Sequence, residues 1–103
     1  VTVFSVPNED YFANYWLSAI LIEPNKAKGI NREALRLAFE AANIESRPLW
    51  KPMHLQPIFE HYPYYGSNVA ETLFEKGLCL PSGSNLTDEE RVRIKKVVFD
   101  FFK

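Results

Sequence analysis

The chain has 103 residues, 47% of them hydrophobic, and its 12 lysines and arginines against 13 aspartates and glutamates leave a net charge of −1. One domain of this size buries about 60–70% of the surface of its unfolded chain, and the near-neutral charge argues against a protein that binds nucleic acid or a membrane surface. The single cysteine, Cys79, excludes an internal disulfide and is typical of a reducing compartment. No apolar run approaches the ~20 residues of a membrane span and no signal-peptide pattern occurs, so we expect a cytoplasmic protein.

The chain begins at Val1, in a polar and turn-prone segment without an initiator methionine. Two explanations stay open. The chain is either a trimmed version of a protein of this size or a piece cut from a longer polypeptide.

The first predicted elements are an apolar strand and an amphipathic helix. Residues 15–22 are mostly apolar and end at a Glu-Pro-Asn turn signal, which favours a central strand over a helix. Asn31 predicts the N-cap of a helix that runs to about Asn43 and must end before Pro48. Apolar residues recur in this helix at i, i+3, i+4 and i+7, as expected for one buried stripe. The stripe consists of Leu35, Ala38, Phe39 and Ala42.

A short helix and a short strand follow in the second half of the chain. Asn68 and Glu71 have the spacing of a reciprocal capping box, and Gly77 predicts the end of the helix that they begin. Residues 78–80 then read as a short strand that ends in a Pro-Ser-Gly-Ser-Asn turn.

The last predicted element is a C-terminal helix. Thr87 and Glu90 form a second capping box at its start. The order strand, helix, arm, helix, strand, helix predicts one α+β domain over residues 1–103, with a small sheet of few strands and about three helices packed on one side. Aromatic residues at 99–102 cover more than one helix face, as expected if a further domain packs there. The apolar stripe of this helix is Ile94, Val97, Val98 and Phe101.

The most informative segment for function is residues 47–57 (RPLWKPMHLQP), which we call the proline arm. Its three prolines exclude a helix and favour a stiff, extended run. Arg47 and Lys51 on this run could clamp phosphate groups, and His54 could hydrogen-bond or protonate a substrate oxygen. Trp50 could stack on a base or a sugar. Solvated ion pairs for the two cations and packing for His54 and Trp50 stay open as structural alternatives.

Other chemistry-bearing residues give weaker signals. Three tyrosines in residues 62–65 could form a carbohydrate-stacking surface or pack down on the domain. Cys79 lies between two leucines without a nearby cation, so we expect a buried, inert thiol. His61 has no partner at metal-ligand spacing, and no metal site is expected.

The proline arm with its flanks, residues 43–57 (NIESRPLWKPMHLQP), resembles the C-terminal small domain of the DegT/StrS family of nucleotide-sugar aminotransferases, which use pyridoxal phosphate. Residues 14–17 (NYWL), 69–71 (VAE) and 77–84 (GLCLPSGS) agree with the same family, in the same order, over nearly all of the chain. The resemblance implies the small-domain fold of fold-type I aminotransferases. The form RPLWKPMH is similar to members that act on UDP-linked 4-keto-6-deoxy sugars bearing an N-acetyl group.

The resemblance also implies what the chain lacks. Members of the family carry the Schiff-base lysine, the acid that pairs with the pyridine nitrogen and the phosphate loops in a large domain. No such motif occurs here, so we expect no catalytic residue and no bound pyridoxal phosphate in this chain, and no activity of the chain alone. Outside the arm, the lysines lie in loops or on polar helix faces: Lys26, Lys28, Lys76, Lys95, Lys96 and Lys103.

By resemblance, the arm has a substrate-binding role. His54 would approach the sugar, Arg47 and Lys51 would face the nucleotide diphosphate or brace a domain interface, and Trp50 and Met53 would line the pocket wall. The implied partners are a large domain of the same polypeptide, which binds pyridoxal phosphate, a second copy in a homodimer, and a nucleotide-sugar substrate. Two alternatives stay open: a stand-alone nucleotide-sugar binding module and a protein-binding domain, both without catalysis.

Overall fold

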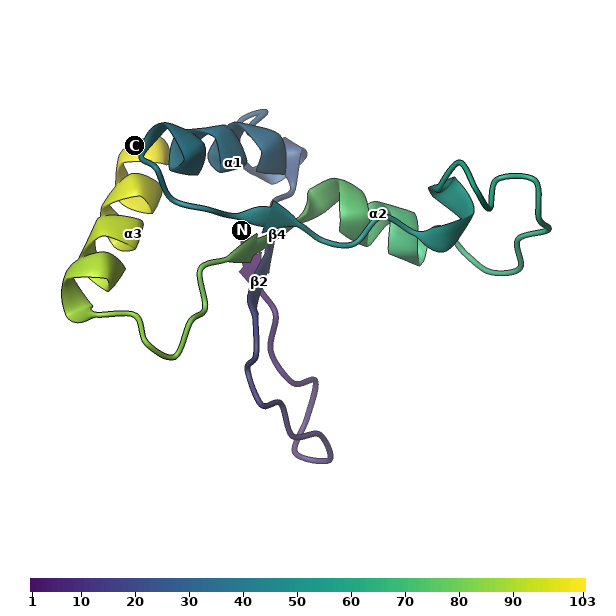
Figure 1. Cartoon of the computed structure of the whole chain (residues 1–103), viewed down its shortest axis with the longest axis horizontal. Coiled ribbons are helices and arrows are strands. Elements are labelled where there is room, and N and C mark those ends of the chain that lie inside the picture. The colour runs from purple at the N-terminus through teal and green to yellow at the C-terminus, as the bar shows by residue number, and fades with distance from the viewer.

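Four short strands form one antiparallel sheet in the computed structural model, which describes residues 1–103 (Figure 1). The strand order is β1-β2-β4-β3, so β2 is central, as the sequence predicts for its apolar segment. Together with three α-helices, this sheet confirms the predicted α+β class. The strands are β1 (Thr2–Val3), β2 (Ser18–Leu21), β3 (Arg47–Pro48) and β4 (Gly77–Leu80), and the helices are α1 (Arg32–Ala41), α2 (Val69–Lys76) and α3 (Asp88–Phe101).

A small core joins the sheet to α1 and α3. Ile20 and Ile22 come from β2 and the residue after it, and Leu78 comes from β4. Leu35 and Phe39 of α1 are fully buried against them, which confirms the centre of the predicted stripe. The predicted stripe of α3 packs on the same core and is half-buried.

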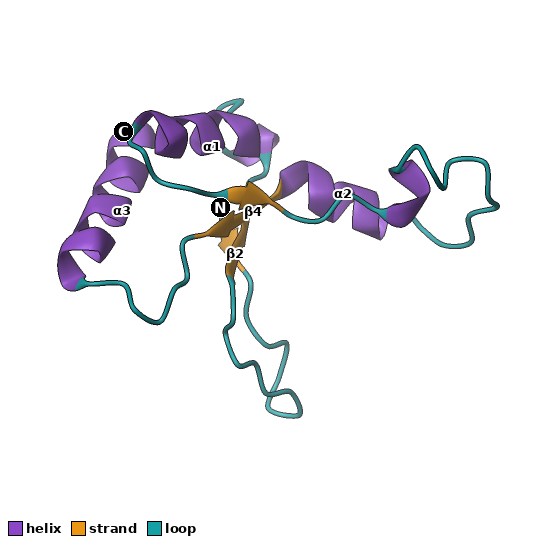
Figure 2. Ribbon diagram, viewed as in Figure 1, coloured by secondary structure: helices purple, strands orange, loops and turns teal.

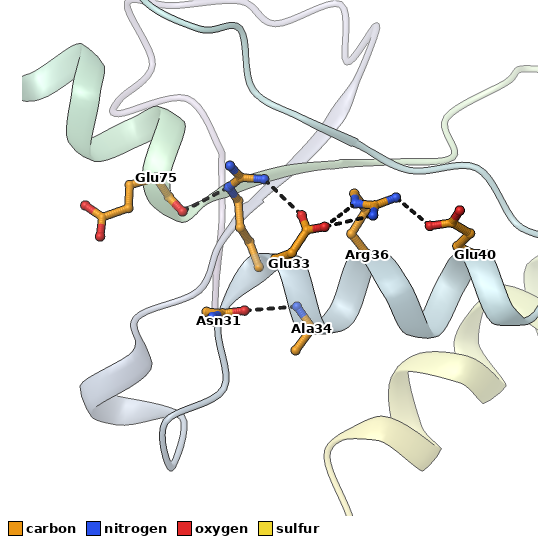
Figure 3. A network of polar contacts seen from close by, with 7 residues as sticks. Asn31, Glu33, Ala34, Arg36, Glu40 and Glu75 are labelled. Carbon is orange, nitrogen blue, oxygen red and sulfur yellow. Dashed lines mark hydrogen bonds and ion pairs between the residues drawn. The ribbon is translucent and has the colours of Figure 1, made fainter.

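Helix α1 begins as the sequence predicts. The side-chain oxygen of Asn31 accepts a hydrogen bond from the backbone N–H of Ala34 at 2.9 Å (Figure 3). The helix ends two residues earlier than expected, because Asn43 adopts a left-handed conformation with φ of +54°. Asparagine tolerates this conformation better than most residues.

The exposed side of α1 carries an ion-pair network (Figure 3). Arg36 donates to Glu33 at 2.9 Å and to Glu40 at 2.7 Å. The hydrogen bond from Arg36 lowers the pKa of Glu33. Arg32 donates to the backbone carbonyl of Glu75 at 3.0 Å, so the start of α1 is tied to the end of α2.

The expectation of a strand over residues 15–22 is correct only for its second half. Tyr15 has a φ of +50°, Trp16 is exposed, and pairing with β4 begins at Ser18. The two aromatic residues raise the apolar content of the segment but face solvent. Strand β1 has only two residues and was not predicted, because two residues are too short to give a pattern.

The predicted capping box at α2 is wrong. The side chain of Asn68 makes no capping hydrogen bond, and its backbone is not in the extended conformation of an N-cap. The carboxylate of Glu71 binds His54 instead. Gly77 ends α2 as predicted, but in an extended rather than a left-handed conformation, and it begins β4 directly.

The capping box of α3 is confirmed. The hydroxyl of Thr87 accepts from the N–H of Glu90 at 3.2 Å, and the carboxylate of Glu90 accepts from the N–H of Thr87 at 2.8 Å. This reciprocal pair satisfies two otherwise free donors at the helix start.

Two long connections project from the sheet, residues 4–17 and residues 49–68 (Figure 2). They stretch the chain to 47 × 34 × 27 Å and its radius of gyration to 15.6 Å, against about 13 Å for a compact chain of this length. None of the three helices has the length and apolar character needed to cross a membrane.

Candidate functional site

The proline arm begins as an edge strand and then turns. Arg47 and Pro48 pair with β4, opposite Cys79 and Leu78. Proline fits an edge strand because its missing N–H faces away from the ladder.

The expected extended conformation of the arm is wrong after Pro52. Residues Met53–Leu55 form a 3-10 helix, in which the N–H of Leu55 donates to Pro52 and that of Gln56 donates to Met53, at 3.1 and 3.0 Å. Prolines at 52 and 57 flank this turn without entering its interior, so they limit its length but do not prevent it.

Two of the five candidate binding residues of the arm line a cavity with a volume of about 740 Å³. Arg47 and Trp50 form one side of it, and Trp16 contributes a second indole from the connection before β2. The side chain of Arg47 is 78% exposed and pairs with Glu45 at 2.6 Å. The cation is therefore accessible to a ligand and held only by a surface ion pair, which contributes little to stability.

The lining of this cavity includes polar groups from the α1–β3 connection and from α3. Arg93 of α3 donates to the backbone carbonyls of Ala42 and Asn43, at the end of α1. Ser46 has a buried hydroxyl oxygen without a hydrogen-bond partner in the chain. No lysine lines the cavity.

His54 lies outside this cavity, in a cluster with Glu71 and Tyr64. Its Nε2 is 2.8 Å from Oε1 of Glu71, and its ring stacks on that of Tyr64 with the centroids 3.7 Å apart. The His54 side chain is 17% exposed. Of the tyrosines expected either to stack on carbohydrate or to pack down, Tyr64 thus packs on His54, whereas Tyr65 is exposed.

The other two candidate residues of the arm, Lys51 and Met53, are exposed and line no part of the cavity. Lys51 makes no ion pair, and its backbone carbonyl accepts a hydrogen bond from Gln56 at 3.1 Å. The side chain of Met53 is exposed as well. The chain by itself therefore brings Arg47 and Trp50 together and leaves Lys51, Met53 and His54 apart from them.

Three residues of these sites were missed in the sequence. Trp16 falls in a segment read as strand, and Arg93 lies on the polar face of a helix with no motif around it. Glu71 was assigned to a helix cap, and its sequence position, 17 residues from His54, gives no indication that the two side chains meet.

Lys76, Lys96 and Lys103 do not have the environment that a Schiff-base lysine for pyridoxal phosphate needs. Such a lysine needs a depressed pKa, from burial without a counter-ion or from a nearby cation. Lys76 instead pairs with Glu23 at 2.9 Å, and both Lys96 and Lys103 pair with Asp100. The hydrogen bond to Asp100 raises the pKa of Lys96.

Cys79 is buried in β4, as expected, and burial raises the pKa of its thiol, which disfavours the reactive thiolate. No three side chains of His, Cys, Asp or Glu lie close enough together to hold a metal ion.

Comparison with known proteins places this geometry in a family. A model of the DegT/DnrJ/EryC1/StrS aminotransferase family matches residues 1–99. EpsN of Bacillus subtilis, whose name describes a pyridoxal phosphate-dependent aminotransferase, is 37% identical over 94 residues, which cover 87% of this chain and 23% of EpsN. GDP-perosamine synthase of Escherichia coli O157:H7 is 30% identical over 95 residues, which cover 92% of this chain and 25% of that protein.

Solved structures agree with this assignment. A DegT DnrJ EryC1 StrS aminotransferase from Brucella abortus is 29% identical, with a TM-score of 0.66 over 84% of this chain and 22% of its own. The aminotransferase TlmJ from Streptoalloteichus hindustanus, at 18% identity, shares the fold with a TM-score of 0.77 over 96% of this chain and 25% of its own. The chain thus spans about a quarter of the length of these relatives. It belongs to the DegT/DnrJ/EryC1/StrS aminotransferase family, whose members are pyridoxal phosphate-dependent.

Proposed function

We propose that this chain is the C-terminal small domain of a longer pyridoxal phosphate-dependent aminotransferase, which converts a nucleotide-linked 4-keto-6-deoxy sugar to its 4-amino sugar. The observation that carries the proposal is the family match over residues 1–99, combined with the coverage of only about a quarter of the relatives. The large domain supplies the cofactor site, and the chain alone is inactive and cytoplasmic.

The surface of the chain supports a large intramolecular partner. A compact monomer of 11.9 kDa exposes about 5,900 Å², whereas this chain exposes 8045 Å². Many of its large apolar side chains are exposed on the two projecting connections, among them Phe12, Trp16, Trp50 and Ile58. The difference, an excess of exposed surface of about 2,000 Å², is in the range of the area buried in obligate interfaces. The large domain and a second subunit of a homodimer would cover it.

In this proposal the proline arm shapes the substrate side of the cleft. His54 approaches the sugar, Arg47 and Lys51 face the nucleotide diphosphate, and Trp50 and Met53 line the wall. The exposure of Arg47, Lys51, Trp50 and Met53 in the chain supports such a role, because these side chains are available to a ligand or to a closing domain. Pyridoxal phosphate supplies the carbanion stabilisation, and this chain contributes positioning and charge.

The nucleotide of the proposed substrate is either UDP or GDP. The form RPLWKPMH is similar to members acting on UDP-linked sugars with an N-acetyl group, whereas three relatives at 28–30% identity are named GDP-perosamine synthase. The assay must therefore offer both a UDP-linked and a GDP-linked 4-keto-6-deoxy sugar.

The test begins with the coding sequence upstream of Val1, which we expect to encode a large domain with a Schiff-base lysine. The longer enzyme, purified with pyridoxal phosphate, should transfer the amino group of glutamate to one of the two keto sugars. The 103-residue chain should show neither cofactor absorbance nor transfer. A borohydride-reducible imine on a lysine of the isolated chain would overturn the proposal, as would a longer enzyme that loads the cofactor but aminates neither sugar.

A stand-alone nucleotide-sugar binding module is the second candidate, and the cavity between Trp16, Trp50 and Arg47 favours it. Two indoles and a cation could hold a base and a phosphate without any chemistry. Calorimetry of the isolated chain with UDP-N-acetylglucosamine and GDP-mannose separates the two candidates. Micromolar or tighter binding would support the module, and no measurable binding would support the small domain of an enzyme.

A further inference from the structure

The imidazole of His54 is held by two neighbours at once. Oε1 of Glu71 lies 2.8 Å from Nε2, and the ring of Tyr64 covers one face of the imidazole at 3.7 Å and an interplanar angle of 20°. Tyr64 is held in turn, because its hydroxyl donates to the backbone carbonyl of Ser67 at 2.5 Å. We call His54, Tyr64 and Glu71 the histidine cluster.

The cluster joins three separate segments of the chain. His54 is on the 3-10 helix of the proline arm, Tyr64 is in the tyrosine-rich stretch of residues 62–65, and Glu71 is in the first turn of α2. Stacking fixes the plane of the imidazole, and the hydrogen bond to Glu71 fixes its rotation within that plane. A side chain locked in this way is pre-organised for a ligand, since little conformational entropy remains to be lost on binding.

The partner of Nε2 decides where the imidazole proton resides. An ionised carboxylate only accepts hydrogen bonds, so Nε2 must carry the hydrogen that Glu71 accepts. In the neutral ring, Nδ1 then has the free lone pair. No hydrogen bond within the chain involves Nδ1, and 17% of the side-chain surface of His54 is exposed.

We propose that Glu71 is a positioning residue that fixes His54 as the Nε2–H tautomer, so that Nδ1 accepts a hydrogen bond from a hydroxyl or an amide N–H of the bound sugar. The part that concerns the sugar rests on the proposed function, whereas the fixed tautomer does not. A carboxylate that orients a histidine through its second nitrogen is a recurring device in active sites. Glu71 acts only through His54 and has no contact with the reacting atoms.

The consequence is a preference among ligands. A site with a fixed acceptor favours a sugar that has a donor at this position over the deoxy analogue, by about ten-fold for one hydrogen bond of roughly 1.4 kcal/mol. Without Glu71 the ring can turn or change tautomer, and this preference is lost.

The first experiment measures the tautomer in the 103-residue chain by NMR of the ring nitrogens at alkaline pH. We expect His54 to show the pure Nε2–H form and a slowly exchanging Nε2 hydrogen. His61 is the internal control, since it is exposed and has no carboxylate partner, and it should show the averaged signals of both tautomers. The variant Glu71→Ala should shift His54 to the averaged signals.

The matched control is Glu75→Ala, which removes the same charge from the same helix. The side chain of Glu75 is exposed and makes no hydrogen bond, so His54 should keep the pure form. If His54 and His61 behave alike in the unmodified chain, or if both variants change His54 equally, the fixed tautomer is disproved.

The second experiment uses the longer enzyme and its keto-sugar substrate. Glu71→Ala should raise KM for the sugar about ten-fold and leave kcat nearly unchanged, because a bond to a non-reacting substituent is made equally in the ground and transition states. Glu75→Ala should change neither constant. If His54→Ala is impaired but Glu71→Ala is not, the role of Glu71 is disproved. If His54→Ala also has no effect, the proposed role of the proline arm fails.

Discussion

At the scale of single residues, close packing rather than backbone conformation explains why position 77 is a glycine. A methyl group built on Gly77 would lie 2.1 Å from Cδ1 of Leu49 and 2.5 Å from the backbone carbonyl of Leu73. The φ of Gly77 is −90°, which any residue can adopt. Glycine is therefore required here by the approach of the proline arm to the junction of α2 and β4. Gly29 is the opposite case, with a φ of +83° and no atom within 4 Å of the added methyl group.

These two glycines give a matched pair of variants. Gly77→Ala should lower the free energy of unfolding by about 3 kcal/mol, since the carbonyl of Leu73 cannot move without disturbing α2. Gly29→Ala should cost only about 1 kcal/mol, from backbone strain. Urea unfolding followed by circular dichroism measures both, and the interpretation is wrong if Gly77→Ala is the milder of the two. Complete unfolding of Gly77→Ala alone would agree with it.

At the scale of elements, the helix ends show how local signals succeed or fail. The box of Thr87 and Glu90 forms because both of its side chains are exposed and have no competing partner. The identical spacing at Asn68 and Glu71 gives no box, because the side chain of Asn68 makes no capping hydrogen bond and the carboxylate of Glu71 binds His54. A carboxylate directed at His54 does not reach back to the N–H of the cap residue.

The cap of α3 can be tested by one substitution. Thr87→Ala removes the acceptor for the N–H of Glu90 and should lower the free energy of unfolding by about 1 kcal/mol. Ser84→Ala is the control, because Ser84 is exposed in the same connection and makes no hydrogen bond, and its effect should stay within about 0.5 kcal/mol. Equal midpoints for the two variants in urea would show that the capping box contributes nothing.

At the scale of the whole molecule, the chain buries few of its residues for its length. Eight of its 103 residues are buried, and the core consists of five side chains around Phe39. Both tryptophans, Trp16 and Trp50, are on projecting connections and are 72% and 69% exposed. Exposed apolar surface of this extent is typical of a site that packs against another protein surface.

The tryptophans make this property measurable. In the 103-residue chain, Trp16 and Trp50 should emit at the long wavelength of a hydrated indole and be quenched by iodide nearly as well as free tryptophan. In the longer enzyme, by our proposal, their emission should move to shorter wavelength and quenching should weaken. Single variants Trp16→Phe and Trp50→Phe assign the change to each residue. Indoles that stay equally quenchable in the longer enzyme would contradict the docking of this surface.

The local pattern was enough to predict a substantial part of the fold. The α+β class, the central strand, the caps at Asn31 and Thr87 and the buried pair Leu35 and Phe39 all follow from interactions within a few residues or from a periodic apolar face. The resemblance carried by the proline arm likewise gave the family that the comparisons confirm. In each case the information is contained in a contiguous stretch of sequence.

Tertiary structure alone decided how the candidate site is divided. The 3-10 helix after Pro52 separates His54 from Arg47 and Trp50, and Trp16 joins the latter two from a segment 31 residues earlier. The pairing of His54 with Glu71, across 17 residues, replaced the cap that the sequence predicts. Contacts between distant segments depend on how the chain packs as a whole, and sequence spacing contains no record of which polar groups that packing brings within hydrogen-bonding distance.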